Sequence, residues 1–284
     1  MCPHSKMKPR PQMAWGLMQN VIDEMVPGAS VCCPFLMQEP ALETRLPAIL
    51  AYIKQVNQRC ATSVYTNMGA WTPEVTRSVL KSGCLDDLHI SFYGPTKELY
   101  EKWQPGMDWG ATKSNIRALF EERNRRGGAH PGITMHYMAI PELVGEDGGL
   151  LRDFIMEWGK YADVFLANYD TFHGDVPNYG DEERFFGPQK ASVRTPCSRL
   201  WSTFSVLSDG KVVACCLDYA EEEVMGDMTK ESGLKIWRGE KFEAFRQKHV
   251  EAWKSGGWSG TGICEGCGVW KRNQSTEWNN LWTK

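Results

Sequence analysis

The first 168 residues alternate between two hydrophobic patterns. Apolar residues at helical spacing predict helices over residues 14–25, 43–57, 113–126 and 150–161, and a Thr-Pro start before a Gly stop predicts another over 73–80. Short apolar or β-branched runs predict strands over residues 30–36, 61–66, 88–92, 133–138 and 164–168. Repeated strand and helix units of this length predict parallel strands joined by right-handed crossovers. The fold class is therefore α/β, most simply part of a parallel barrel.

The pattern changes after residue 168. Residues 169–196 are rich in Gly, Pro, Asp and Asn and show neither period, so we expect a linker there, between a domain at 1–168 and a smaller one at 197–284. In the second domain, Asp209-Gly210 predicts a tight turn between strands at 204–207 and 211–215. A helix is expected over 241–253, followed by a Gly/Ser-rich loop at 255–262.

Charge and hydropathy exclude two classes of partner. The 284 residues include 32 Lys and Arg against 35 Asp and Glu, and this net charge of −3 provides no basic field for a phosphate backbone. No apolar run reaches the 18 or so residues of a membrane helix, and residues 1–13 are too polar for a secretory signal. We therefore expect a cytoplasmic protein that has neither a nucleic-acid partner nor a membrane segment.

The ten cysteines are the first sign of specific chemistry. A cytoplasmic chain has little need of disulfides, and cysteines at short spacings there more often hold metal. Cys264 and Cys267 form a Cys-x-x-Cys loop between glycines, and Cys197 with Cys215 would complete a four-thiolate shell. Cys216 competes with Cys215 as the ligand. Spacing alone leaves zinc and an iron–sulfur cluster both open.

These cysteines also carry a family resemblance. Cys197, then Gly210 five residues before Cys215, then the Cys264 and Cys267 pair, resembles the SPASM extension of radical S-adenosylmethionine (SAM) enzymes. No third cysteine group follows Cys267, so the extension is most similar to the shortened twitch form, which holds one auxiliary [4Fe–4S] cluster. In that family the glycine spacing favours Cys215 over Cys216.

The first half resembles the radical SAM core, a partial parallel barrel of six strands. The family marks that core with Cys-x-x-x-Cys-x-x-Cys, which binds a [4Fe–4S] cluster that in turn chelates SAM. The opening residues are similar to the stretch that begins at the third motif cysteine, so Cys2 would be that ligand. The resemblance thus implies a chain that lacks the first strand of the (β/α)6 barrel, and a fragment that is inactive by itself.

Three further residues match positions that hold SAM in the family. Met37-Gln38-Glu39-Pro40 stands where the family has Gly-Gly-Glu-Pro, so Glu39 matches the carboxylate that meets the SAM ammonium, while both glycines are replaced. Asn67 and Ser91 end the next two predicted strands and match polar residues around the SAM carboxylate and ribose. The resemblance implies that Glu39, Asn67 and Ser91 bind SAM.

The activity implied by the resemblance is that of an oxidoreductase or maturase. A 5′-deoxyadenosyl radical would abstract hydrogen from a small-molecule or peptide substrate, with electrons from a donor such as flavodoxin or ferredoxin. Ligands meet the carboxyl ends of strands in such barrels, so His136, Asn168, Asp170 and His173 are placed to accept a proton, and we expect Asp170 and His173 to be catalytic. The alternative is a non-catalytic, four-cysteine zinc or iron–sulfur protein that serves in binding or electron transfer.

Overall fold

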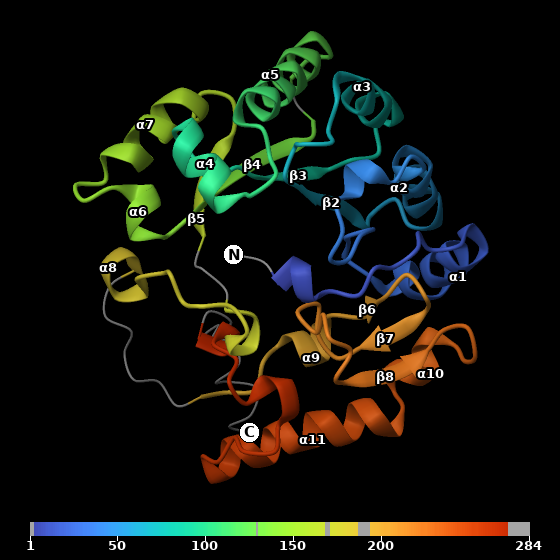
Figure 1. The fold of residues 1–284 in the computed structure, drawn as a ribbon. Coiled ribbons are helices and arrows are strands. Elements are labelled where there is room, and N and C mark those ends of the chain that lie inside the picture. The colour runs from blue at the N-terminus through green and yellow to red at the C-terminus, as the bar shows by residue number, and fades with distance from the viewer. Residues whose placement is uncertain (1–2, 129, 168–170, 187–193, 272–284) are drawn as a thin grey trace. The chain divides into compact units, whose positions relative to one another are not determined.

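The computed structural model describes all residues except 1–2, 129, 168–170, 187–193 and 272–284 (Figure 1). The chain forms two compact units, which we describe separately. The sheet unit comprises residues 18–169 and 179–185, and the cysteine unit comprises residues 1–17, 170–178 and 186–284. The domain limits predicted from the sequence stay a prediction.

The sheet unit is built on five parallel strands that are paired in chain order. They are β1 (Val31–Cys32), β2 (Ala61–Thr66), β3 (Asp87–Ser91), β4 (Gly132–Met138) and β5 (Asp163–Ala167). Strictly sequential order with parallel pairing requires a crossover between every two strands, and helices supply most of that connection. The predicted α/β class and the parallel sheet are confirmed.

Helices cover one side of this sheet (Figure 1). The longer ones are α1 (Trp15–Met25), α2 (Leu46–Val56), α3 (Pro73–Ser82), α4 (Lys97–Trp103), α5 (Trp109–Arg125) and α7 (Gly149–Trp158). Shorter turns are η2 (Val26–Gly28), η3 (Pro40–Leu42), α6 (Pro141–Val144) and α8 (Glu182–Phe186). The α3 ends follow the sequence signals, because the Thr72 hydroxyl accepts from the Val75 amide and Gly83 adopts φ 63°.

The core lies between the sheet and these helices. Alternate strand residues are fully buried on the helix side, namely Val64, Leu88, Ile90, Met135 and Tyr137. The intervening residues point to the opposite face and are less buried, which leaves Tyr65, His89, Ser91, His136 and Phe165 on one surface of the sheet. The strand alternation thus separates a packed face from a polar and aromatic face.

Three elements differ from the sequence prediction. The strand expected over 30–36 shrinks to Val31–Cys32, because Pro34 has no amide hydrogen and the Phe35 amide turns back to bond Cys33 O at 2.8 Å. Helix α5 begins at Trp109, four residues early, because Asp108 caps it by accepting from the Ala111 amide. Helix α4 was not predicted, although Thr96 caps it in the same way.

The cysteine unit contains a three-stranded antiparallel sheet and a long helix. The strands are β6 (Ser205–Val206), β7 (Lys211–Val213) and β8 (Val224–Asp227), in that order. The helices are α9 (Arg199–Ser202), α10 (Gly233–Trp237) and α11 (Glu240–Ser255), with turns η1 (Pro3–Lys6), η4 (Phe172–Gly174), η5 (Gly262–Cys264) and η6 (Val269–Lys271). The predicted hairpin is present, whereas the sequence did not predict β8 as its third strand.

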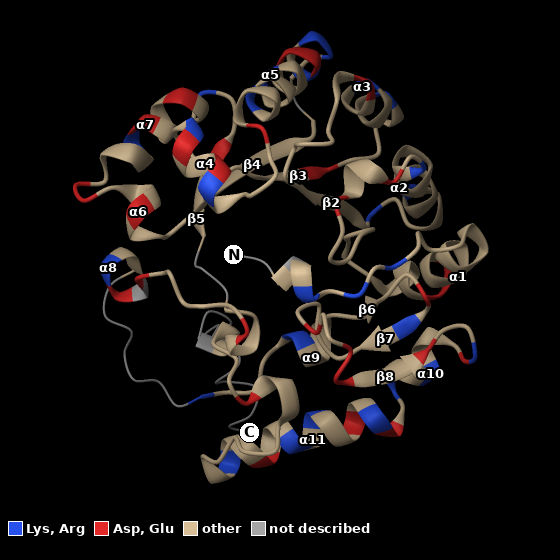
Figure 2. Ribbon diagram, viewed as in Figure 1, with Lys and Arg blue, Asp and Glu red and all other residues tan. Residues whose placement is uncertain are grey.

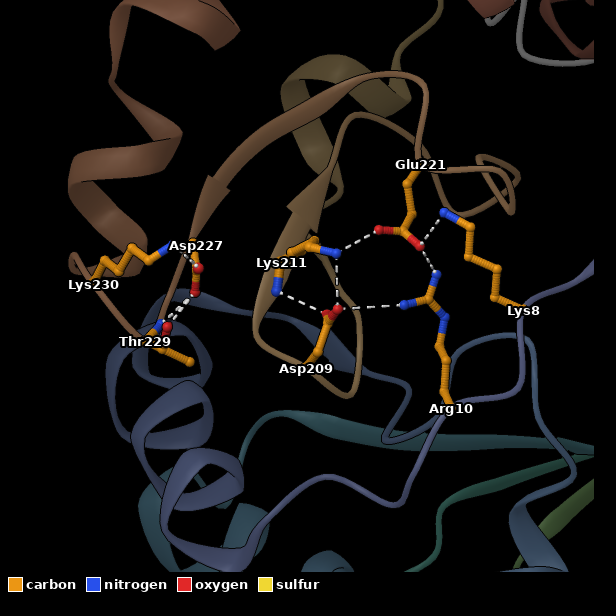
Figure 3. A network of polar contacts seen from close by, with 8 residues as sticks. All are labelled: Lys8, Arg10, Asp209, Lys211, Glu221, Asp227, Thr229 and Lys230. Carbon is orange, nitrogen blue, oxygen red and sulfur yellow. Dashed lines mark hydrogen bonds and ion pairs between the residues drawn. The ribbon is translucent and has the colours of Figure 1, made fainter.

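Ion pairs fix the segment at residues 8–10 to the hairpin within the cysteine unit (Figure 3). Glu221 accepts from Arg10 at 2.5 Å and from Lys211 at 2.7 Å, and Lys8 lies 3.4 Å away. The Glu221 side chain is only 7% exposed, and its neighbours lower the pKa of its carboxyl to about 2, chiefly through the Lys211 hydrogen bond. A nearly buried carboxylate therefore joins two segments that are far apart in the sequence.

Helix α11 carries charged side chains of both signs along its length. Figure 2 shows Lys and Arg interspersed with Asp and Glu along α11, whose buried side consists of residues such as Phe242 and Phe245. Among the helices that the structure describes, none combines the length and the apolar character required to cross a membrane.

Candidate functional site

The four predicted metal-binding cysteines line one cavity of the cysteine unit. Cys197 lies just before α9, Cys215 follows β7, Cys264 ends η5, and Cys267 follows three residues later. Turns deliver each of them, because Gly210 with φ 91° closes the hairpin before Cys215 and Gly262 with φ 57° begins the turn before Cys264. Three separate stretches of chain thus place four thiols around one space.

Two of these sulfurs accept backbone hydrogen bonds. The Leu217 amide lies 3.4 Å from Cys215 Sγ, and the Val269 amide lies 3.4 Å from Cys267 Sγ. An amide N–H aimed at sulfur stabilises the thiolate, which is the form that binds metal. Cys216 has a different environment: it is not among the residues that line the cavity, and its Sγ accepts from Arg199 Nη1 at 3.4 Å.

Burial favours the protonated form of these thiols. It raises the pKa of Cys264, and the neighbouring thiols of Cys215, Cys267 and Cys197 raise it further. The pKa of Cys215 is also raised, first by its hydrogen bond with Cys216 and then by burial. A cation that binds here must therefore displace protons, so its affinity is expected to rise with pH.

Two arginines lie in the cavity wall and would balance the negative charge of metal-bound thiolates. The thiols of Cys216 and Cys215 raise the pKa of Arg199 against the opposing effect of burial. Burial lowers the pKa of Arg194, an effect that the nearby sulfurs of Cys267 and Cys264 partly offset. Two guanidinium groups so close to four thiols suit a site whose occupied form carries net negative charge.

Arg194 is also part of the structure that holds the Cys-x-x-Cys loop. Its guanidinium donates to the backbone carbonyls of Cys264 and Glu265, the latter at 2.8 Å. It lies 4.1 Å from the ring centre of Trp258, which is a cation–π distance. The bonds from Arg194 therefore fix the position of the loop from which two of the four thiols come.

The donor set fits an iron–sulfur cluster. The four cysteines line one cavity, and four thiolates are the donor set of a [4Fe–4S] cluster. Arg194 and Arg199 in the same wall would offset the negative charge of such a cluster.

A second group of polar residues lies at the carboxyl ends of β2 and β3 in the sheet unit. The carboxylate of Glu39 accepts from the Thr66 hydroxyl at 2.6 Å, the Asn67 amide at 2.9 Å and the Ala41 amide at 3.1 Å. Thr66 pairs with Ile90 in the parallel register, so Asn67 and Ser91 follow at the same level. The structure thus brings Glu39, Asn67 and Ser91 to one edge of the sheet.

The backbone two residues before Glu39 has a conformation that favours glycine. Met37 has φ 59°, in the left-handed region, and it stands at the position where the related motif has a glycine. Holding a side chain there costs about 1–2 kcal/mol. The first of the two positions at which this chain lacks the motif's glycines therefore has a backbone conformation that glycine would adopt at lower cost.

A row of rings crosses the polar face of the sheet next to this edge. Tyr65 stacks on His89 with ring centres 4.1 Å apart, and His89 Nδ1 lies 3.0 Å from His136 Nε2. Phe165 meets His136 edge-on at 5.3 Å. Burial, followed by the His89 ring, lowers the pKa of His136 to about 4, so this pair is neutral at pH 7.

The structure describes only some of the residues predicted for catalysis and for the core cluster. Cys2 and Asp170 lie outside the described residues. His173 lies in the wall of the cysteine cavity, and the catalytic role predicted for it stays a prediction. His89, Arg194 and Arg199 were not predicted as site residues. Arginines that flank a predicted ligand cysteine on both sides, as in Arg194-Thr-Pro-Cys197-Ser-Arg199, were an available signal for the last two.

Comparison with known proteins identifies the cysteine-rich region and finds solved proteins of similar fold. Residues 197–268 match the family model of SPASM, described as an iron–sulfur cluster-binding domain. The structure of BtrN in complex with AdoMet and 2-DOIA has a TM-score of 0.59 at 14% identity, over 94% of this chain and 85% of that one. No protein of curated function matches the chain significantly in sequence.

A second solved protein has a similar fold. Native anSMEcpe with bound AdoMet has a TM-score of 0.61 at 11% identity, over 86% of this chain and 77% of that one. The same protein with bound AdoMet and the Kp18Cys peptide gives 0.57 at 13%, over 84% and 75%. BtrN and anSMEcpe are radical SAM enzymes with SPASM or twitch domains. The chain thus has the fold of radical SAM enzymes and carries a SPASM domain.

Proposed function

We propose that the protein is a radical SAM enzyme in which Cys197, Cys215, Cys264 and Cys267 hold an auxiliary [4Fe–4S] cluster. The observation that carries this proposal is the convergence of these cysteines, from three stretches of chain, on the cavity of the SPASM domain. All four ligands then come from protein. The auxiliary cluster accordingly has no open iron for a substrate and serves electron transfer or folding.

Glu39, Asn67 and Ser91 are proposed to bind SAM at the carboxyl edge of the sheet. Three hydrogen bonds fix the Glu39 carboxylate, so it presents a preset negative charge to the SAM ammonium. Asn67 Oδ1 accepts from the Gly69 amide at 2.9 Å, which leaves the side-chain NH2 group to donate to a ligand. Cys2 is proposed as one ligand of the core cluster.

With SAM and the core cluster bound, and one electron from a donor such as flavodoxin or ferredoxin, the site would supply a 5′-deoxyadenosyl radical for hydrogen abstraction from substrate, with methionine as the other product of SAM cleavage. The chain's own part is to orient the ligand and exclude water at this edge. The substrate is proposed to be a small molecule or a peptide. The solved structures of similar fold include one of each, 2-DOIA with BtrN and an 18Cys peptide with anSMEcpe.

The direct test is reductive cleavage of SAM by the protein, reconstituted with iron and sulfide. Once reduced, it should form 5′-deoxyadenosine, measured by liquid chromatography and mass spectrometry. A Glu39→Gln variant should form much less at limiting SAM, whereas Glu43→Gln, on the same loop but bonded to Arg45, should match the unaltered protein. A cluster-loaded protein that forms no 5′-deoxyadenosine would contradict the enzyme assignment and favour the electron-transfer alternative.

A further inference from the structure

His173 has two buried ring nitrogens without a hydrogen-bond partner among the described residues. It belongs to the turn η4, where it adopts φ 64°, and it lines the same cavity as the four cysteines. Its carbonyl oxygen lies against the Cys-x-x-Cys loop, because a Cβ added at Gly266 would approach it to 3.1 Å. The imidazole is therefore held beside the sulfurs by its own backbone.

An unpartnered imidazole needs an acceptor whichever tautomer it adopts. A neutral ring carries one N–H, at either Nδ1 or Nε2, and a buried donor left without an acceptor costs about 1–3 kcal/mol. The described residues provide no hydrogen-bond partner for either nitrogen of His173, and this includes the four cysteine sulfurs of the cavity. The acceptor must therefore come from what these cysteines bind, and the sulfides of an iron–sulfur cluster accept hydrogen bonds.

His249 is a second histidine of this cavity, and unlike His173 it already has a hydrogen-bond acceptor. It is 1% exposed, and its Nδ1 lies 2.9 Å from the carbonyl oxygen of Phe245, which can only accept. The single N–H of its neutral ring is therefore already used, and its Nε2 is a lone pair. Of the two imidazoles, only His173 has an N–H to give.

We infer that His173 donates an N–H···S hydrogen bond to a sulfide of the auxiliary cluster and thereby sets the cluster's reduction potential. This inference rests on the proposed function, because it requires the auxiliary cluster. Reduction adds negative charge to the sulfurs, so a donor stabilises the reduced form more and raises the potential. In this role His173 acts through the cluster, as a positioning residue, and does not itself break a bond in SAM or substrate.

The test is an EPR-monitored redox titration of the reconstituted chain and two variants. The auxiliary signal is first assigned as the one that Cys264→Ala removes. His173→Phe keeps the ring volume but removes the donor, and should lower the equilibrium constant for reduction about tenfold, which is about 59 mV for one electron. His173→Gln restores an N–H donor and should recover most of the shift. His130→Gln, at an exposed histidine, is the control and should change nothing.

A second measurement does not depend on how the variants fold. In the unaltered protein labelled with ¹⁵N-histidine, pulsed EPR of the reduced auxiliary cluster should show coupling to an imidazole nitrogen and to an exchangeable proton. Absence of that coupling, or an unshifted potential in cluster-loaded His173→Phe, would overturn the role of His173 and leave the auxiliary cluster standing. A chain that takes up zinc but no iron–sulfur cluster would overturn the proposed function itself.

Discussion

Nδ1 of His89 lies 3.0 Å from Nε2 of His136, and this contact joins two neighbouring strands on the polar face of the sheet. One of the two nitrogens must donate and the other accept, so the pair shares a single proton between the strands. Protonating both rings would place two N–H groups against each other. The burial that lowers the pKa of both rings acts in the same direction.

The first prediction is that this pair makes the sheet unit less stable in mild acid. His136 has a pKa of about 4 in the folded chain and about 6.5 when unfolded, so between these values only the unfolded chain binds the proton. The free energy of unfolding should therefore fall from pH 7 to pH 5, by about 1–2 kcal/mol after allowance for solvent screening. Urea titrations at both pH values measure it.

His136→Gln removes the titrating ring and should lose most of this pH dependence. His130→Gln, at an exposed histidine, should keep it. If the unaltered protein and His136→Gln lost equal stability between pH 7 and pH 5, the neutral histidine pair would not be the cause.

The second prediction concerns the buried carboxylate of Glu221. Glu221→Gln removes the charge that Arg10 and Lys211 contact, and should destabilise the cysteine unit by roughly 1–3 kcal/mol. The pKa of Glu221 is lowered from 4.5 to about 2, so its contribution is complete above pH 4.5 and lost as the pH falls toward 2. Denaturant titrations of both proteins at neutral pH and near pH 3 test the amount and the sign.

The matched control is Lys230→Gln. Lys230 lies 2.9 Å from Asp227, but its side chain is 78% exposed, so its loss should change the stability by less than about 0.5 kcal/mol. Both substitutions are at residues drawn in Figure 3. Equal effects of Glu221→Gln and Lys230→Gln on the free energy of unfolding would show that the ion pairs of Glu221 contribute no more than an ordinary surface pair.

Local signals in the sequence predicted the elements that depend on neighbouring residues. The cap at Thr72 and the turn at Asp209-Gly210 are of this kind, because both are determined within a few residues. The predicted strand at 30–36 was too long because the turn after Cys33 breaks the ladder, although Pro34 was visible in the sequence. Strand β8 was missed because a short edge strand has too few residues to show a period.

The candidate sites likewise combine residues that the sequence predicted with residues that only the fold brings together. The four cysteines were predictable because Cys-x-x-Cys spacing and the glycines around it are sequence features. Two histidines beside these cysteines were not, since His173 and His249 reach the cavity from segments whose proximity only the fold determines. Arg194, by contrast, lies three residues before Cys197 in the sequence. The bond between Glu39 and the Asn67 amide likewise joins residues 28 positions apart, and no spacing rule gives it.

The third prediction is that Glu39→Gln weakens SAM binding without unfolding the sheet unit. The substitution removes the negative charge and places an NH2 group among donors from Thr66, Asn67 and Ala41, one of which must lose its acceptor. We expect the SAM dissociation constant of the cluster-loaded protein to rise about tenfold, which corresponds to about 1.4 kcal/mol. Equilibrium dialysis measures it, and Glu43→Gln is the matched carboxylate control. Unchanged affinity in Glu39→Gln would remove Glu39 from the SAM site.

The last prediction separates the auxiliary cluster from SAM cleavage. Cys267→Ala removes a thiol whose sulfur accepts from the Val269 amide, so the chain should lose the auxiliary cluster and about four irons, as counted by chemical analysis. Cleavage of SAM should partly persist in this variant, because it needs only the core cluster, while substrate turnover falls. Cys216→Ala is the matched control: its side chain is not among those that line the cavity, so iron content should be unchanged.

Loss of a metal site can also unfold a loop-rich unit, and circular dichroism of both variants distinguishes that cause. A Cys267→Ala protein with native-like dichroism and normal turnover would show that the auxiliary cluster is dispensable, and equal iron loss in Cys216→Ala would show that the ligand is Cys216.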